Sequence, residues 1–214
     1  MSTPLDARER VQLCARFEEL GPDAPTLCEG WTTFDLAAHL VVRERNPLSG
    51  PGIVLGDKIK PAADLTERLM EREKRKGFAR VVERVRTGPP IGPFKVPGLR
   101  DRINLVEYAV HHEDARRAND LPVREGIDDL QDALWGNLKN LARFALRGIK
   151  DTEVTLARPG GESATVRKGS AAATMTGDPL ELLLFLYGRG DHAHVDFTGD
   201  PVAIDRLQAA RLGI

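Results

Sequence analysis

The sequence has few cysteines, no long apolar run and almost no net charge, and each absence excludes a class of protein. Its 214 residues include two cysteines, Cys14 and Cys28, which is too few for a disulfide framework. Apolar neighbours surround both, which favours buried thiols over catalytic ones. No stretch approaches the roughly 20 apolar residues that span a bilayer, and residues 1–10 lack the apolar core of a signal peptide. We therefore expect a soluble, cytoplasmic protein with no membrane partner.

The charges of the chain nearly cancel. Its 31 basic and 32 acidic residues give a formal net charge of −1, which offers no general attraction to nucleic acid or to anionic membranes. Apolar residues make up 41% of the chain, enough for a packed core. We expect no nucleic-acid partner, and the composition leaves the oligomeric state open.

Most of the first two thirds of the chain has the apolar spacing of amphipathic helices. We predict helices over residues 5–20, from Thr32 or Thr33 to Asn46, and over 64–86, 101–119 and 128–147. Glycine and proline between them predict loops around residues 50–61 and 87–99. Long helices with short or moderate connections are typical of an up-and-down bundle.

The pattern changes near residue 149. Alternation predicts strands over residues 152–157 and 163–167, joined as a hairpin by Gly160-Gly161, and further strands over 172–176 and 194–198. Short helices are expected over residues 180–187 and 201–212. The predicted fold class is mainly α: a helical bundle over residues 1–149, followed by a small α/β domain over 150–214.

Glu107 and His111 are the strongest candidates for chemistry. They stand four residues apart, so on a helix both side chains point to one face. His39 shares an apolar stripe with Leu36 and Leu40, which directs it to the interior of the bundle. A carboxylate and two imidazoles can share a divalent metal and leave a coordination position open. The ordinary alternative is a helix-surface ion pair.

Two neighbours of His111 leave alternatives open. His112 is rotated about 100° around the helix from His111, and it is the second choice of ligand. Asp114 can orient a ligating imidazole, or it can pair with Arg117 at the surface.

Three further residues admit a functional and an ordinary interpretation. His192 and His194 could share one face of a strand and form a separate metal site, but an exposed, unliganded pair is more typical. Trp31 is interpreted as packing the start of a helix rather than as a stacking platform for a ligand.

Three segments resemble a known family. The segment Leu27-Cys28-Glu29-Gly30-Trp31-Thr32-Thr33-Phe34-Asp35-Leu36-Ala37-Ala38-His39-Leu40 resembles a signature of DinB-like metal-binding bundles, and more closely the mycothiol-dependent maleylpyruvate isomerase group. Glu107-x-x-x-His111 with Asp114 resembles the second signature of that group. Residues 177–189 resemble part of its small C-terminal α/β domain, so the resemblance covers nearly the whole chain.

The resemblance implies a divalent metal, usually zinc, held by His39, Glu107 and His111. It also implies a small thiol such as mycothiol, which is deprotonated at the metal and attacks an electrophilic substrate in an isomerase or transferase reaction. Arg189 is the candidate catalytic residue that holds a substrate carboxylate, with a solvated residue after a helix as the alternative. The chain departs from the group at His112-Glu113 and Arg116-Arg117. The resemblance therefore supports metal binding more strongly than it supports isomerase activity.

Two other functions remain open from the sequence. One is a metal-binding sensor or scaffold without catalysis, which four protein ligands would favour. The other is a carrier of an apolar ligand in residues 150–214, a segment that leaves little volume for a cavity. Two imidazoles and a carboxylate also suit nickel, iron or manganese.

Overall fold

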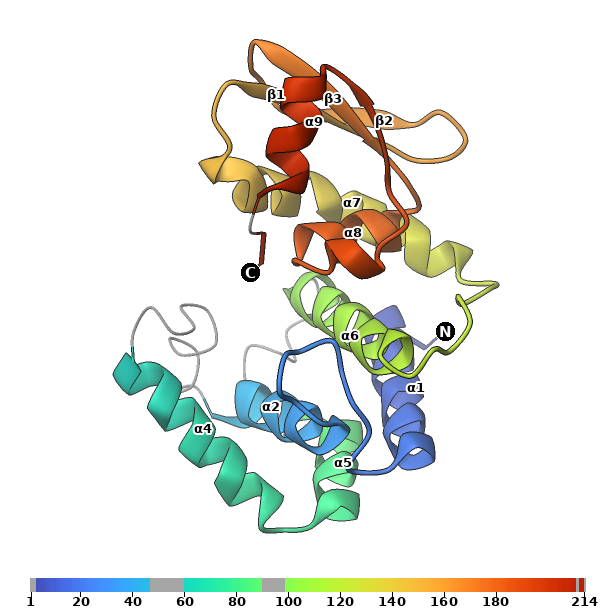
Figure 1. Ribbon diagram of the computed structural model, residues 1–214. Helices are drawn as coiled ribbons and strands as arrows, with labels where there is room; N and C mark the ends of the chain where they lie inside the picture. Colours follow the sequence, from blue (N-terminus) through green and yellow to red (C-terminus); the bar gives the residue numbers. More distant parts are fainter. Residues whose placement is uncertain (1–2, 47–59, 90–98, 211, 214) are drawn as a thin grey trace. The chain divides into compact units, whose positions relative to one another are not determined.

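The computed structural model describes residues 3–46, 60–89, 99–210 and 212–213, and it divides into two compact units (Figure 1). The first unit runs to Val123 and the second begins at Arg124. The expected boundary near residue 149 differs from this division. The helix at residues 128–145 contacts a helix and a strand of the second unit, so it is part of that unit rather than of the bundle.

The described part of the first unit is helical. It comprises α1 (Leu5–Leu20), α2 (Thr33–Arg45), α4 (Lys60–Lys74), α5 (Phe78–Thr87) and α6 (Leu99–Arg117). Helix α1 packs against α5 and α6, while α2 packs against α4 and α5. Their apolar faces form one core, which includes Leu13, Phe17, Leu36, Leu40, Val81 and Val82. The expected mainly helical first part of the chain is therefore present.

The start of α2 follows from a local sequence signal. The Thr32 side chain accepts a hydrogen bond from the backbone N–H of Asp35, and the Asp35 carboxylate accepts one from the backbone N–H of Thr32. This reciprocal pair satisfies amide groups that a helix N-terminus leaves free. Thr32 is thus the capping residue of the two that the sequence allowed, and it sets His39 in the second turn of α2.

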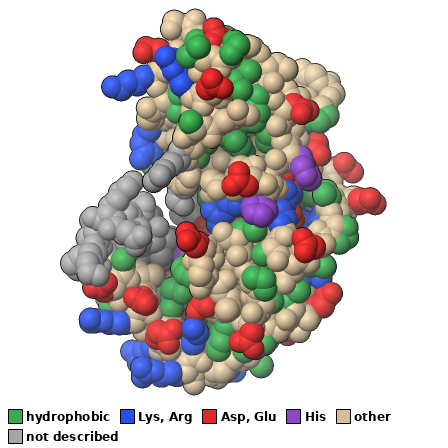
Figure 2. Space-filling view, viewed as in Figure 1, with side chains coloured by type: hydrophobic (Ala, Val, Ile, Leu, Met, Phe, Trp, Pro, Cys, Tyr) green, Lys and Arg blue, Asp and Glu red, His purple; other side chains and the backbone are tan. Residues whose placement is uncertain are grey.

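The helix expected over residues 64–86 is two helices, α4 and α5. Gly77 lies between them with φ of 86°, a backbone conformation that costs glycine little and other residues more. The chain turns there, so that α4 and α5 both pack on α2. The prediction of one continuous helix was wrong at this point. In Figure 2 charged side chains of both signs lie at the lower left, over α4.

The second unit contains a four-stranded sheet and helices. Its strands are β1 (Thr152–Ala157), β2 (Ser163–Arg167), β3 (Ala171–Thr176) and β4 (Asp196–Gly199), in the order β2-β1-β3-β4. The β1–β2 and β3–β4 pairs are antiparallel, while β1 and β3 are parallel. The parallel register sets Val154 opposite Ala173 and Leu156 opposite Met175, which places buried side chains together on one face.

The helices of this unit are α7 (Asp128–Ala145), α8 (Pro179–Leu186) and α9 (Pro201–Gln208), with short 3-10 turns at Leu146–Gly148 and Gly190–His192. Helix α7 contacts α8 and β2, and α9 contacts β1, β3 and β4. The hairpin and the small α/β character were predicted correctly. The fourth strand begins two residues later, and the last helix ends four residues earlier, than the sequence indicated. None of the described helices is both long and apolar enough to cross a membrane.

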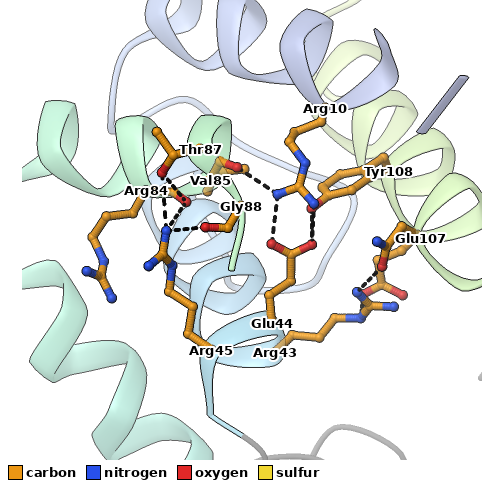
Figure 3. A network of polar contacts seen from close by, with 11 residues as sticks. Arg10, Arg43, Glu44, Arg45, Arg84, Val85, Thr87, Gly88, Glu107 and Tyr108 are labelled. Carbon is orange, nitrogen blue, oxygen red and sulfur yellow. Dashed lines mark hydrogen bonds and ion pairs between the residues drawn. The ribbon is translucent and has the colours of Figure 1, made fainter. Parts of the chain in front are cut away.

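A buried polar network joins four helices of the first unit (Figure 3). The Arg10 guanidinium of α1 forms two hydrogen bonds with the Glu44 carboxylate of α2, at 2.6 and 2.7 Å, and a third at 2.7 Å with the Val85 carbonyl of α5. The Tyr108 hydroxyl of α6 donates to Glu44, and Arg10 lies over the Tyr108 ring at 4.5 Å. Burial is the main cause that raises the pKa of Tyr108, so its hydroxyl stays protonated and donates. The buried Glu44 carboxylate therefore has both a counter-charge, from Arg10, and hydrogen-bond donors, from Arg10 and Tyr108.

If one residue of this network is replaced, the bundle should unfold at a lower denaturant concentration than the wild type. Glu44→Leu leaves the Arg10 guanidinium buried without its carboxylate, and we expect a loss of about 3–5 kcal/mol in the free energy of unfolding. Urea unfolding followed by circular dichroism measures this loss. A double replacement, Arg10→Met with Glu44→Leu, should recover part of it, because no charge is then left unpaired.

The control is Glu19→Gln, which removes an ion pair with Arg16 in which the Glu19 side chain is 63% exposed. We expect a change below about 1 kcal/mol there. Equal losses in the Glu44 and Glu19 variants would contradict the structural role assigned to the network.

Candidate metal centre

Three side chains from two helices converge on one point in the first unit. The His39 Nε2 atom on α2 lies 3.4 Å from Glu107 Oε1 on α6, and the His111 Nε2 atom lies 3.3 Å from the same oxygen. The three possible ligand atoms lie within 4.8 Å of one another. The structure thus brings together the three residues that the sequence predicted as ligands, and each presents a lone-pair atom to a shared space.

The spacing of these atoms suits ligands around a shared metal as well as long hydrogen bonds. Hydrogen bonds from nitrogen to oxygen are usually about 2.7–3.2 Å long, and the two separations here are longer. A tetrahedral zinc ion with bonds of about 2.0–2.1 Å sets its ligands about 3.3–3.4 Å apart. The donor set of two imidazoles and one carboxylate is also one that zinc accepts. The residues present therefore fit a divalent metal.

The cluster is mostly screened from water. The His39, His111 and Glu107 side chains are 9%, 11% and 17% exposed, so the carboxylate is the most accessible of the three. The Trp31 ring lies 5.1 Å from the His39 ring and covers it from the loop before α2. Such surroundings strengthen electrostatic interactions inside the site.

Asp114 fixes the orientation of His111. Its Oδ2 atom lies 2.9 Å from His111 Nδ1, and the carboxylate is fully buried. The same oxygen accepts a hydrogen bond from the Cys28 thiol at 3.3 Å, and the Asp114 carbonyl accepts one from the Leu27 amide. With its Nδ1 hydrogen directed at Asp114, the His111 ring turns Nε2 toward Glu107, which is the arrangement that orients metal-ligating histidines.

Arg43 supplies a positive charge beside the cluster. Its Nε atom lies 3.1 Å from Glu107 Oε1, and its Nη1 donates to the Asn104 side chain at 3.3 Å. Figure 3 shows this guanidinium beside Glu107. A carboxylate has two oxygens and about four acceptor sites, so Glu107 can keep Arg43 while it offers a lone pair to a cation.

The electrostatics keep the carboxylate charged and place a proton on one imidazole. Burial acts to raise the pKa of Glu107, but the charge of Arg43 and the hydrogen bonds from both histidines hold it well below its ordinary value. Burial acts to lower the pKa of His111, but hydrogen bonds with Asp114, Cys28 and Glu107 outweigh it and raise that pKa well above 6.5. Burial lowers the pKa of His39. The Glu107 carboxylate is therefore negative, and the positive Arg43 guanidinium and the protonated His111 ring lie beside it.

The structure decides between the alternatives left open by the sequence. His112 turns away from the cluster toward α1, where its Nδ1 lies 3.3 Å from Glu9 Oε2. Arg117 pairs with Glu113 at 2.7 Å, while the Asp114 carboxylate lies 2.9 Å from His111 Nδ1. His111 is therefore the histidine at the cluster, and Asp114 lies beneath it.

The remaining sequence candidates lie in the second unit. Arg189 is half-buried beyond α8, and its guanidinium donates to the Tyr187 carbonyl at 2.5 Å. Its role with a substrate carboxylate remains a prediction. His192 and His194 are exposed and precede β4 rather than sharing a strand face. Among the described residues, neither belongs to a group with metal-ligand spacing.

Sequence reasoning missed the part that Cys28, Trp31 and Arg43 take in the site. Cys28, His111 and Asp114 form a second group whose ligand atoms lie within 4.8 Å of one another. Cys28 is half-buried and contacts Asp114, unlike Cys14, whose burial raises its pKa to about 12. The available signals were the position of Cys28 and Trp31 in the motif before α2, and of Arg43 one turn after His39.

Comparison of the chain with models of protein families, with curated proteins and with solved structures finds no match. The class of the site therefore rests on its own geometry: a buried group of two imidazoles and one carboxylate that could hold a metal ion.

Replacing Asp114 should weaken metal binding without removing a ligand. Asp114→Asn keeps the shape of the side chain but loses the charge that orients and polarises His111, and we expect a 10–100-fold lower zinc affinity. Competition with a coloured zinc chelator measures the affinity. Asp23→Asn, at an exposed position in the loop before α2, is the matched control and should bind zinc like the wild type. Equal affinities in the two variants would remove Asp114 from the site.

The metal-free protein should lose stability as the pH rises above 6.5. His111 has a pKa raised well above 6.5, so as the pH rises past about 6.5 the folded state holds more protons than the unfolded state, and the free energy of unfolding decreases with rising pH. In His111→Gln this decrease should be smaller. Urea unfolding of chelator-treated protein at several pH values tests the difference, and parallel pH profiles would contradict the assignment.

Proposed function

We propose that the chain binds one divalent metal ion through His39 Nε2, the Glu107 carboxylate and His111 Nε2, with zinc as the ion of choice. The observation that carries this proposal is the convergence of both Nε2 atoms on one carboxylate oxygen, at 3.3 and 3.4 Å, with His111 held from behind by Asp114. Metal ligands held in this way need little rearrangement on binding. Nickel, iron and manganese accept the same donors.

We further propose that the chain is an enzyme of the thiol-using type, either an isomerase or a transferase. Three protein ligands leave a coordination position for a small molecule, and the motifs before α2 and in α6 resemble those of the mycothiol-dependent maleylpyruvate isomerase group within the DinB-like bundles. A divalent metal bound there would favour the thiolate form of a thiol such as mycothiol at neutral pH.

The residues of the chain would divide the work around that thiol. Glu107 and the two histidines hold the cation, Asp114 keeps His111 in its ligating orientation, and Arg43 keeps Glu107 ionised. Trp31 packs beside the His39 ring. The second substrate would be an electrophile, and Arg189 remains the candidate for binding its carboxylate.

The alternative is a metal-binding sensor or scaffold without catalysis. The low exposure of His39 and His111 favours it, because a buried site admits a co-substrate less readily than an open cleft does. The Cys28 thiol beside Asp114 is a further donor within the same neighbourhood. A site closed by four protein ligands is typical of structural rather than catalytic zinc.

Metal analysis distinguishes binding from its absence. The wild type should purify with, or take up, close to one equivalent of zinc, whereas His39→Ala should retain a small fraction of that amount, because one of three ligands is lost. His192→Ala removes an exposed histidine outside the cluster and is the matched control. The same metal content in wild type and His39→Ala would show that the site is assigned to the wrong residues.

Thiol titration then separates the enzyme from the sensor. Cobalt in place of zinc should give a new absorption band when mycothiol is added, because a thiolate has joined the metal. A cobalt spectrum that mycothiol leaves unchanged would reject the thiol mechanism and favour the sensor or scaffold.

A further inference from the structure

A cavity of about 200 Å³ lies among α2, α4 and α5, apart from the metal cluster. On α2, His39 and Arg43 contact Glu107 of α6, whereas the cavity is lined from the same helix by Val41, Val42 and Arg45. The two sites thus use different faces of α2. Helix α4 adds Leu69, Arg72 and Glu73, and α5 adds Arg84. Asn46, just after α2, and Lys76, in the turn between α4 and α5, complete the lining.

The lining carries an excess of positive charge. Its charged residues are Arg45, Arg72, Lys76 and Arg84 against the single carboxylate of Glu73. That carboxylate is already shared, because Lys76 Nζ lies 2.6 Å from one of its oxygens and Arg84 Nε lies 3.0 Å from the other. Among the residues that the structure describes, no carboxylate pairs with Arg72.

Within the described part of the chain, the hydrogen bonds of Arg45 go to neutral oxygens. Its Nη2 atom donates to the Arg84 carbonyl at 3.1 Å and to the Thr87 hydroxyl at 3.2 Å, at the C-terminal end of α5 (Figure 3). A third hydrogen bond reaches the Gly88 carbonyl. Partial burial, and then the charge of Arg84, lower the pKa of Arg45. The guanidinium is therefore positioned by the fold without a full counter-charge.

We infer that this cavity binds a small oxyanion, namely the phosphate or carboxylate group of a small molecule. Guanidinium groups bind both through paired hydrogen bonds, and an anion would relieve the repulsion between neighbouring cations. Val41, Val42 and Leu69 give the cavity an apolar side, which suits a ligand with a short hydrocarbon part. The volume restricts the ligand to a few non-hydrogen atoms, since a dry cavity of about 150 Å³ holds one benzene.

The experiment titrates the full-length, metal-free protein with sodium phosphate, and separately with sodium malonate, at constant ionic strength set by sodium chloride. Backbone amide chemical shifts report where each anion binds. We expect saturable shifts in residues 69–76 and around Arg84 with at least one of the two probes. In Arg72→Gln with Lys76→Gln, binding should weaken about tenfold or more, since two charged contacts are lost.

Two controls locate the site. Arg75→Gln removes an exposed cation just after α4 that does not line the cavity, and this variant should bind like the wild type. His39→Ala should also bind like the wild type, which separates this cavity from the metal cluster. The inference is overturned if neither anion gives saturable shifts. Unchanged affinity in the Arg72/Lys76 double variant, or loss of binding in His39→Ala, would overturn it equally.

Discussion

The first unit depends on a pair of polar contacts between α2 and α6. The neighbours Arg43 and Glu44 on α2 reach the neighbours Glu107 and Tyr108 on α6, so two consecutive positions on each helix are matched. Burial of apolar surface is non-directional, whereas a buried carboxylate accepts partners only at particular positions. These contacts therefore fix the height of one helix against the other. A slip by one turn, about 5.4 Å, would separate His39 from Glu107.

The same contacts link the stability of the fold to the geometry of the site. Glu44 is held by Arg10 and Tyr108, and the next residue back, Arg43, holds Glu107. Glu44 on α2 and Tyr108 on α6 thus belong to the buried network, and the adjacent residues, Arg43 and Glu107, are a counter-charge and a candidate ligand. A polar network of this kind can position a site accurately because every member has a partner. It also explains why charged side chains are buried in the middle of a small helical bundle.

Local rules predicted most of the elements but not how they are grouped. A capping threonine placed the start of α2 to within one residue, Thr32 or Thr33, and alternation with Gly160-Gly161 predicted the hairpin, since both depend on neighbours in sequence. The break at Gly77 was not predicted, because a single glycine inside a helical pattern costs only about 1 kcal/mol. The packing of both α4 and α5 on α2 favours two helices over one continuous helix. The apolar face of α7 showed that it is buried, but not that it packs on α8.

The candidate ligands were predictable because periodicity decides which side chains share a helix face. Glu107 and His111 follow from their spacing, and the stripe that contains His39 directs it inward. The roles of Arg43, Asp114 and Cys28 depend on how α2 and the loop before it meet α6, and no pattern within one helix contains that information. Asp114 could be weighed from sequence only as one of two alternatives, and its burial beneath His111 decides between them.

The chain contains two tryptophans, and the fold places one in each unit. Trp31 faces the His39 ring in the first unit, and Trp135 lies on α7 in the second, 6.0 Å from the Arg158 guanidinium. Each unit therefore carries its own fluorophore. Single-tryptophan variants would let the melting of each unit be followed by emission, which matters because a chain of two compact units need not unfold in one cooperative step.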